Sequence, residues 1–233
     1  MSGYDVDALR REEFPWAVAG ETIYLNNAST GPLPQRTVAA LDEWNRLRAN
    51  PQRAPQELQF GTLARSRALI ASMIGADAAE IALAANTSFG LNLAAFSLPL
   101  KHGDVVLSPD LEFPANVYPW MQLAARRGIE YRRLSCDEGV LDPDRLAREL
   151  EDERVRAVTV SWVQAVSGAR VDLTALGKLC RARGVFFVVD AIQGLGPLTV
   201  DLRETPVDIL SSGAQKWLLS PWGSAFVYVR RDL

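Results

Sequence analysis

The segment "GVFFVVDAIQGLG" (184–196) contains an unbroken apolar run that ends in a carboxylate, Asp190. A strand without polar alternation is typical of a sheet that is covered on both faces. A buried carboxylate without a partner costs several kcal/mol or changes its protonation state, so a cation is expected beside Asp190. The segment therefore predicts a doubly covered sheet with a charged group where one strand ends.

Six further apolar segments alternate with helical patterns along the chain, which predicts the α/β class. Strands are expected at 80–85, 104–109, 129–134, 156–162, 185–190, 207–213 and 224–230. Helices are expected at 34–50, 57–76, from Ser88, 115–127, 143–151 and 173–184. The prediction is a mainly parallel central sheet with helices on both faces, formed by one domain over 35–233. Residues 1–34 are expected to form an extended N-terminal arm on the substrate side.

The composition is that of a folded globular protein, with 233 residues of which 48% are hydrophobic and 23% charged. A net charge of -3 with mixed signs gives no basic face for nucleic acid or an anionic membrane surface. The N-terminus lacks a basic head followed by an apolar core, and no apolar run of ~18 residues occurs. We therefore expect a cytoplasmic protein that binds neither nucleic acid nor a membrane.

Cysteine and histidine are scarce, which excludes several kinds of site. Cys136 and Cys180 lie far apart without CxxC spacing, so neither a disulfide framework nor a metal site is expected. The single histidine, His102, falls in a polar turn, and no GxSxG motif is present. A Ser-His-Asp triad or a Cys-His dyad is therefore disfavoured.

Lys216 follows the expected strand at 207–213, at the sheet edge where ligands of α/β proteins collect. A lysine in a partly dry cleft can lose its proton and form a Schiff base with a carbonyl group. Pyridoxal 5'-phosphate (PLP) has an aldehyde for that lysine, a protonated ring nitrogen for Asp190 and a phosphate. Gln193 is placed to donate its amide to the phenolic oxygen of the ring. The combination predicts a PLP site.

The remaining PLP contacts are expected at two other strand ends. Thr87 and Ser88 in "NTSFGLNL" (86–93) begin a helix, where unpaired N–H groups and the helix dipole favour a phosphate. Phe113 lies just after another strand, where an aromatic ring can stack on a cofactor. Taken singly, these residues are an ordinary helix cap and a core phenylalanine, as Lys216 alone is a solvated loop lysine; only together do they indicate a site.

The N-terminal segment "YLNNASTGPLP" (24–34) predicts a turn after a short strand. Turn chemistry explains Asn26 and Asn27 adequately, because Asn, Gly and Pro favour tight turns. Such a turn can also line a cleft, so the segment is a candidate for contact with a substrate.

Six segments in this order resemble class V aminotransferase-type proteins of PLP-dependent fold type I, a group with cysteine desulfurases, isopenicillin N epimerase-like proteins and kynureninases. They are "YLNNASTGPLP" (24–34), "NTSFGLNLAA" (86–95), "LEFPANVYPW" (111–120), "WVQAVSGARVDL" (162–173), "VVDAIQGLGPLTVDL" (188–202) and "SSGAQKWLLSPWGSAFVYV" (211–229). The resemblance covers nearly the whole chain and implies a large PLP-binding domain at 35–233 that forms a homodimer.

The resemblance also implies individual roles. Lys216 would be the Schiff-base lysine and Asp190 the partner of the pyridine nitrogen, as the two catalytic residues. Further cofactor contacts would come from Thr87, Ser88, Phe113, Gln164, Gln193 and Ser212, and substrate contacts from Asn27 and Ala28.

The chain departs from the family in its site and its length. Desulfurases carry histidines where this chain has Gln215 and Phe113. Neither Cys136 nor Cys180 lies in a segment expected to be a mobile loop that carries a persulfide. Sulfur chemistry is therefore disfavoured. Family members continue into a small C-terminal domain that supplies an arginine for the substrate carboxylate. That domain is apparently absent from a chain that ends at Leu233. A fragment, a naturally shortened protein and a second polypeptide that completes the fold are the alternatives.

The leading hypothesis is a PLP enzyme that acts at the α-carbon of an amino acid, with Lys216 as general base. Aminotransferase, epimerase and lyase reactions share these steps, and no residue selects among them. The alternative is a truncated, catalytically deficient PLP-fold protein that serves as a binding or assembly partner, or one half of a split enzyme. A dinucleotide-binding reductase is disfavoured, because "GLG" (194–196) lacks a GxGxxG pattern and a following helix.

Overall fold

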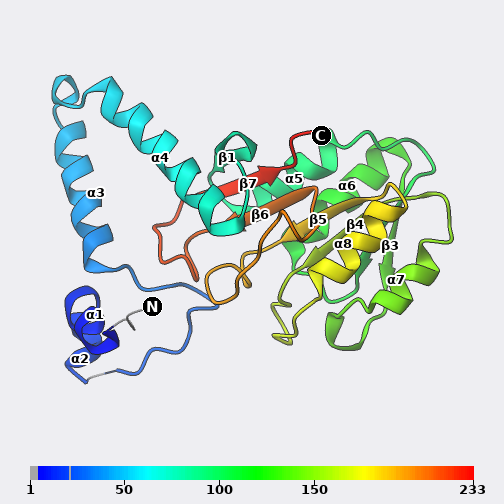
Figure 1. Cartoon of the computed structure of the whole chain (residues 1–233), viewed down its shortest axis with the longest axis horizontal. Helices are drawn as coiled ribbons and strands as arrows, with labels where there is room; N and C mark the ends of the chain where they lie inside the picture. Colours follow the sequence, from blue (N-terminus) through cyan, green and yellow to red (C-terminus); the bar gives the residue numbers. More distant parts are fainter. Residues whose placement is uncertain (1–4, 21) are drawn as a thin grey trace.

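The computed structural model describes residues 5–20 and 22–233. Within these ranges one seven-stranded sheet forms the centre of the molecule, in the order β1-β7-β6-β5-β4-β2-β3 (Figure 1). The strands are β1 (Ile81–Ala84), β2 (Val105–Pro109), β3 (Glu130–Leu134), β4 (Val155–Ser161), β5 (Phe186–Asp190), β6 (Ile209–Gly213) and β7 (Ala225–Val229). The seven strands expected between residues 80 and 230 are therefore confirmed to within two residues at either end.

The sheet is mainly parallel. Strands β3, β2, β4, β5 and β6 run in the same direction, and β7 lies antiparallel between β6 and β1. The register places Asp190 opposite Ser161 of β4 and Ser211 of β6. The carboxyl ends of three neighbouring strands thus meet around Asp190, as expected for the ligand-binding edge of an α/β sheet.

Helices cover both faces of this sheet, which confirms the predicted fold class. The helices are α1 (Val6–Glu13), α2 (Pro15–Val18), α3 (Gln35–Arg48), α4 (Gln56–Ile74), α5 (Thr87–Ser97), α6 (Tyr118–Arg127), α7 (Pro143–Glu149) and α8 (Leu173–Ala182). Short 3-10 turns are η1 (Pro51–Arg53), η2 (Ala78–Glu80), η3 (Pro114–Asn116) and η4 (Asp137–Gly139).

Two hydrophobic cores result, one on each face. Leu91 of α5 and Trp120 of α6 pack with Val106 and Val188 on one face. Leu176 of α8, with residues of α4 and α7, packs on the other face. Adjacent strand residues point to opposite faces, and each fully buried large apolar side chain contributes roughly 2 kcal/mol. Strands β2, β4 and β5 lack polar alternation because helices cover both faces of the sheet.

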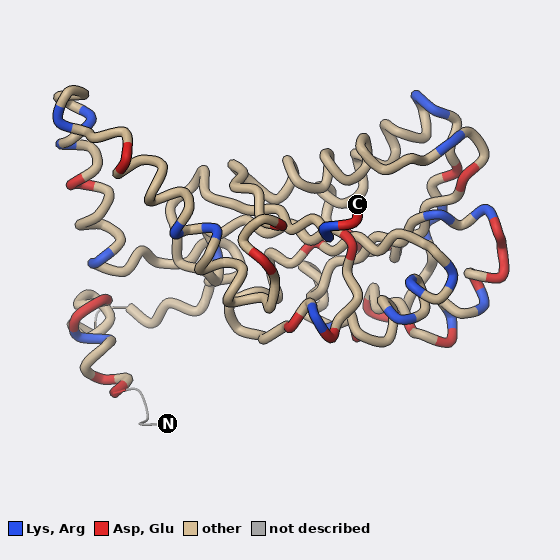
Figure 2. The backbone as a smooth tube through the Cα atoms, turned by 45° about the horizontal axis from the view of Figure 1, so that its top comes forward, with Lys and Arg blue, Asp and Glu red and all other residues tan. Residues whose placement is uncertain are grey.

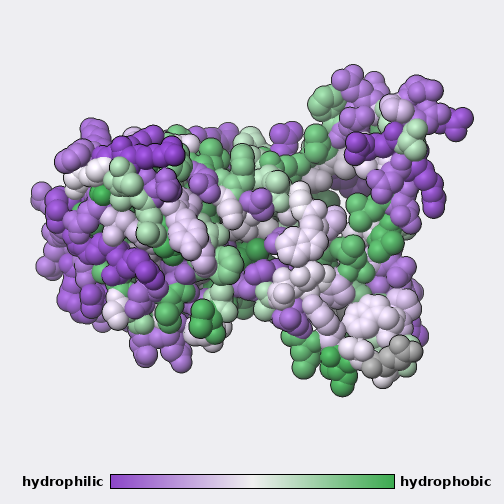
Figure 3. All heavy atoms as spheres, turned by 180° about the vertical axis from the view of Figure 1, so that it is seen from behind, coloured by the Kyte–Doolittle hydropathy of each residue, from purple (hydrophilic) through white to green (hydrophobic). Residues whose placement is uncertain are grey.

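Helices α3 and α4 form a hairpin that extends away from the sheet (Figure 1). No residue of α3 is buried, and only Ala71 and Ile74 of α4 are. Leu58, Phe60 and Leu63 of α4 are exposed. Hydrophobic residues consequently reach the surface between the hairpin and the sheet (Figure 3).

The N-terminal segment differs from the expected extended arm, because it folds into α1 and α2. Asp5 caps α1 by accepting a hydrogen bond from the Ala8 N–H, and Pro15 begins α2, a position that suits its fixed φ. The short strand expected before Asn26 is also wrong: Ile23 and Leu25 are 86% and 88% exposed in irregular chain. An extended segment without a neighbouring strand has only water for its backbone groups.

Charges of both signs are mixed along the backbone (Figure 2). At the edge strand β3, Arg132 pairs with Glu130 and Asp152, and such charges discourage pairing with another sheet edge. In the part of the chain that the structure describes, no helix is both long and apolar enough to cross a membrane.

Candidate active site

A cavity of about 500 Å³ opens at the carboxyl edge of the sheet. Its lining brings together side chains from segments that lie up to about 190 residues apart in the sequence, since the fold gathers strand ends at one edge. The lining residues are Ala28, Ser29, Asn86, Thr87, Ser88, Phe113, Ala115, Ser161, Val163, Ala165, Asp190, Ile192, Gln193, Gln215, Lys216 and Trp222.

Asp190 lies in this cavity and is only 3% exposed. Its carboxylate accepts a hydrogen bond from the Ile192 N–H at 3.0 Å, and no cationic side chain of the described residues pairs with it. Burial raises the pKa of Asp190 to about 7; the Ile192 N–H opposes this, Glu112 adds to it and Lys216 opposes it. A buried carboxylate without a paired cation fits the protonated ring nitrogen of PLP.

Lys216 lies in the same cavity, three residues after β6. Burial lowers the pKa of Lys216, and the nearby charge of Asp190 opposes that change. Its Nζ lies 5.9 Å from the centroid of the Phe113 ring. A half-buried amine with a lowered pKa is more readily deprotonated, and the uncharged amine is the form that attacks a carbonyl carbon.

The N-terminus of α5 forms the end of the cavity that suits an anion. The Asn86 side chain caps the helix by accepting from the Phe89 N–H at 2.8 Å. Thr87 and Ser88 line the cavity at the first turn, where N–H groups lack intrahelical partners. The Ser88 hydroxyl and these N–H groups fit the phosphate of PLP.

Thr87 also ties α5 to the strand that leads to Lys216. Its hydroxyl accepts from the Gly213 N–H at 2.8 Å, and its carbonyl accepts from the Ser211 hydroxyl at 2.9 Å. Gly90 permits this approach, because a Cβ there would lie 2.3 Å from the Ser211 hydroxyl oxygen. The α5 N-terminus and the Lys216 loop are thereby held in a fixed relation.

Three expected site residues do not line this cavity, and their roles stay predictions. The buried Gln164 donates its amide to Glu112 at 2.8 Å, and the buried Ser212 donates to the Gly213 carbonyl at 3.1 Å. Asn27 lines a separate surface cavity together with residues of α1 and α2. Neighbouring residues of a strand or turn point in different directions, and sequence position alone does not reveal which side chain faces the site.

Gln193 lines the cavity, but its amide already has protein partners. Its Nε2 donates to the Ala28 carbonyl at 3.0 Å, and its Oε1 accepts from the Trp217 indole at 2.9 Å. Its amide nitrogen keeps one further N–H for the phenolic oxygen of PLP. The contact also places Ala28, an expected substrate residue, at the cavity.

Gly31 fixes the N-terminal segment against the Lys216 loop. Its N–H donates to the Gln215 carbonyl at 2.8 Å, and a Cβ at this position would lie 1.9 Å from the Lys216 carbonyl oxygen. No side-chain rearrangement removes such a clash, because the atom that it meets is backbone.

We expect Gly31→Ala to separate the two segments and to lower the free energy of unfolding by about 1–3 kcal/mol, as overpacking does elsewhere. Urea unfolding measures the loss. Gly61→Ala is the matched control, because a Cβ at Gly61 of α4 meets no atom within 4 Å and alanine is the better helix former. Equal stability of both variants would contradict the close approach.

Glu112 lies behind the cavity and affects the site, and sequence reasoning missed it. It precedes Phe113 in the segment after β2, and its charge contributes to the raised pKa of Asp190. A carboxylate beside an aromatic residue at a strand end is the signal that could have found it.

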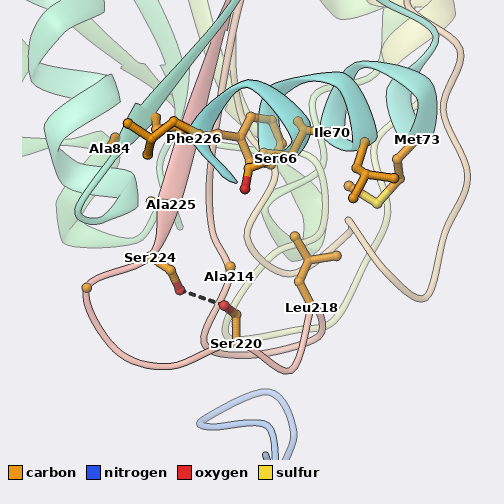
Figure 4. A pocket seen from close by; sticks show the side chains of 14 residues that line it. Ser66, Ile70, Met73, Ala84, Ala214, Leu218, Ser220, Ser224, Ala225 and Phe226 are labelled. Carbon is orange, nitrogen blue, oxygen red and sulfur yellow. Dashed lines mark hydrogen bonds between the residues drawn. The ribbon is translucent and has the colours of Figure 1, made fainter. Parts of the chain in front are cut away.

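A second cavity of about 560 Å³ is lined by residues of α4, β7 and the segment 214–225 (Figure 4). Ile70 and Met73 of α4 lie opposite Leu218, and the Ser224 hydroxyl donates to that of Ser220 at 2.9 Å. None of its lining residues is ionisable, in contrast to the cavity that contains Asp190 and Lys216.

One family profile and two curated relatives match nearly the whole chain. The profile of a family described as "Aminotransferase class-V" matches residues 23–233. A probable cysteine desulfurase of Methanothermobacter thermautotrophicus is 33% identical over 216 residues, which cover 91% of this chain and 54% of the relative. Isopenicillin N epimerase of Streptomyces clavuligerus is 32% identical over 89% of this chain and 53% of that enzyme. The chain thus spans about half the length of these curated relatives.

Solved structures agree with the sequence relatives. The apo structure of a cysteine desulfurase from Thermococcus onnurineus NA1 superposes with a TM-score of 0.86 at 28% identity, covering 99% of this chain and 58% of that one.

Proposed function

We propose, since the chain belongs to the aminotransferase class-V family, that it binds PLP and forms the cofactor-binding part of an enzyme acting at the α-carbon of an amino acid. One observation carries the proposal: Asp190 and Lys216 line one cavity, with the pKa of the acid raised and that of the amine lowered. Titratable groups whose environments move their pKa values toward each other are typical of catalytic sites.

When bound, PLP supplies an electron-withdrawing ring that stabilises negative charge on the α-carbon of an attached amino acid. Asp190 would hold the ring nitrogen protonated, and the α5 N-terminus with Ser88 would hold the phosphate. Phe113 would cover one ring face. Lys216 would hold the aldehyde group of PLP through Nζ, and the same atom would serve as the base that accepts the α-proton of the substrate.

The reaction type that we propose is a lyase or an epimerase rather than a transaminase, in line with the names of the relatives. The cavity presents Phe113 and Gln215, and neither cysteine lines it. Burial raises the pKa of Cys136 to about 11 and that of Cys180 to about 12, so neither is a ready thiolate. These features disfavour a persulfide on this chain.

A second candidate is a PLP-binding protein that needs a partner for turnover. The lining of the cavity favours this candidate, because it includes no arginine among the described residues. The cavity therefore lacks a guanidinium group that could bind a substrate carboxylate through two hydrogen bonds. A second copy of the chain or another polypeptide would supply that group.

The test is addition of PLP followed by amino acids in D₂O. We expect an absorbance band at about 420 nm on addition of PLP, and exchange of the α-proton of a suitable amino acid, followed by NMR. Alanine, serine and cysteine are suitable first probes. A band without exchange would favour the second candidate, and the absence of a band would overturn the cofactor assignment.

A further inference from the structure

A buried polar cluster lies behind the Phe113 wall of the cavity, and Glu112 is its centre. Glu112 is 7% exposed and accepts four hydrogen bonds. The donors are the Ser161 N–H at 2.7 Å, the Ser161 hydroxyl at 2.5 Å, the Asn116 amide at 2.8 Å and the Gln164 amide at 2.8 Å. With two donors on each oxygen, the carboxylate is held in a single orientation.

The cluster joins two segments of the chain that are distant in sequence. Asn116 lies on the segment that follows β2, Ser161 ends β4, and Gln164 lies on the next loop. The amide oxygen of Asn116 accepts from the Thr159 hydroxyl at 2.6 Å, which extends the network along β4. None of the described residues forms an ion pair with Glu112, so hydrogen bonds alone compensate for its burial.

The residues that this cluster holds are those that face the cavity. Phe113 adjoins Glu112 in the chain, is 49% exposed and has Lys216 Nζ at 5.9 Å from its ring centroid. Ser161 lines the cavity and lies opposite Asp190 in the sheet. Glu112 itself does not line the cavity. Glu112 therefore acts on a bound cofactor through Phe113 and Ser161, and through its charge near Asp190.

We propose that Glu112 is a positioning residue, which holds the Phe113 ring and the end of β4 in place against PLP. This inference rests on the proposed PLP function. A side chain fixed by its supporting shell loses little conformational freedom when the ligand binds, so binding is tighter.

Glu112→Gln tests the proposal, because it keeps the shape but turns one hydrogen-bond acceptor into a donor. The new NH₂ group faces donors already present, so the cluster has to rearrange. We expect PLP affinity to fall by about tenfold, the equivalent of one broken buried hydrogen bond. The visible circular dichroism per bound PLP should also fall, because it reports how rigidly the ring is held.

Gln164→Leu is a milder second variant should Glu112→Gln not fold. It removes one donor to Glu112 and also removes Gln164 Oε1, which is buried without a partner, so little stability should be lost. We expect a smaller loss of PLP affinity and of visible circular dichroism in the same direction.

Asp208→Asn is the matched control. Asp208 is 4% exposed and accepts from the Phe187 N–H at 2.7 Å and from Arg230 at 2.8 Å. It precedes β6 and therefore lies at the end of that strand remote from the cavity. We expect this variant to lose thermal stability but to keep the PLP affinity and the circular dichroism.

Two results would overturn the positioning role: unchanged PLP affinity and circular dichroism in both cluster variants, or equal losses in Asp208→Asn. Failure of the wild-type chain to bind PLP at all is a different result, which would reject the proposed function itself and this inference with it.

Discussion

Lys216→Ala is expected to abolish the band at about 420 nm that PLP forms with a protein lysine, and to slow α-proton exchange by about 10²- to 10⁴-fold. Lys216 is the lysine that lines the cavity, and its amine would both hold the cofactor and take the proton. Absorbance spectroscopy and NMR in D₂O measure the two effects separately.

The chain offers clean controls for this substitution. Its other lysines are Lys101 and Lys178, both exposed and neither at the cavity. Lys101→Ala and Lys178→Ala should leave the band and the exchange unchanged. A band that persists in Lys216→Ala but disappears in either control would place the reactive lysine elsewhere.

Asp190→Asn is expected to stabilise the PLP-free protein at pH 8 while weakening PLP binding by about 100-fold or more. The pKa of Asp190 is raised to about 7 by burial, whereas an unfolded aspartate titrates near its ordinary value of about 3.9. Above pH 7 the PLP-free wild type therefore contains a buried charge without a paired cation, which the neutral amide avoids.

The pH dependence has a definite sign. Between about pH 4 and 7 the folded state binds a proton that the unfolded state has released, so the stability of the PLP-free wild type falls as the pH rises. At pH 4 and below this effect is absent. The advantage of Asp190→Asn should grow from near zero at pH 4 to at most about 4 kcal/mol above pH 7.

Urea unfolding of both PLP-free proteins at pH 4, 6 and 8 measures this difference. Asp172→Asn, at an exposed helix cap, is a control that should show no such increase with pH. A wild type that is more stable than Asp190→Asn at pH 8 without PLP would contradict the conclusion that Asp190 is a buried carboxylate without a paired cation.

Much of the fold and part of the site could be predicted from local patterns. The apolar runs that became β2, β4 and β5 indicate strands buried on both faces, and parallel strands bring their carboxyl ends to one edge. Asp190 ends β5, and Phe113, Ser88 and Lys216 follow β2, β1 and β6, which run in the same direction, so their convergence follows from the topology.

The details of the site that local sequence does not predict depend on contacts between distant residues. Gln164 turns inward because Glu112, 52 positions earlier, accepts its amide, and Gln193 turns to Ala28 across 165 positions. The expected strand before Asn26 found no strand to pair with. The positions of the strands, and with them the ligand-binding edge, follow from periodicity and composition along the chain, whereas the order of the strands depends on tertiary pairing. The direction of each side chain depends on hydrogen-bond partners and packing that exist only after the chain has folded, because those partners are remote in sequence.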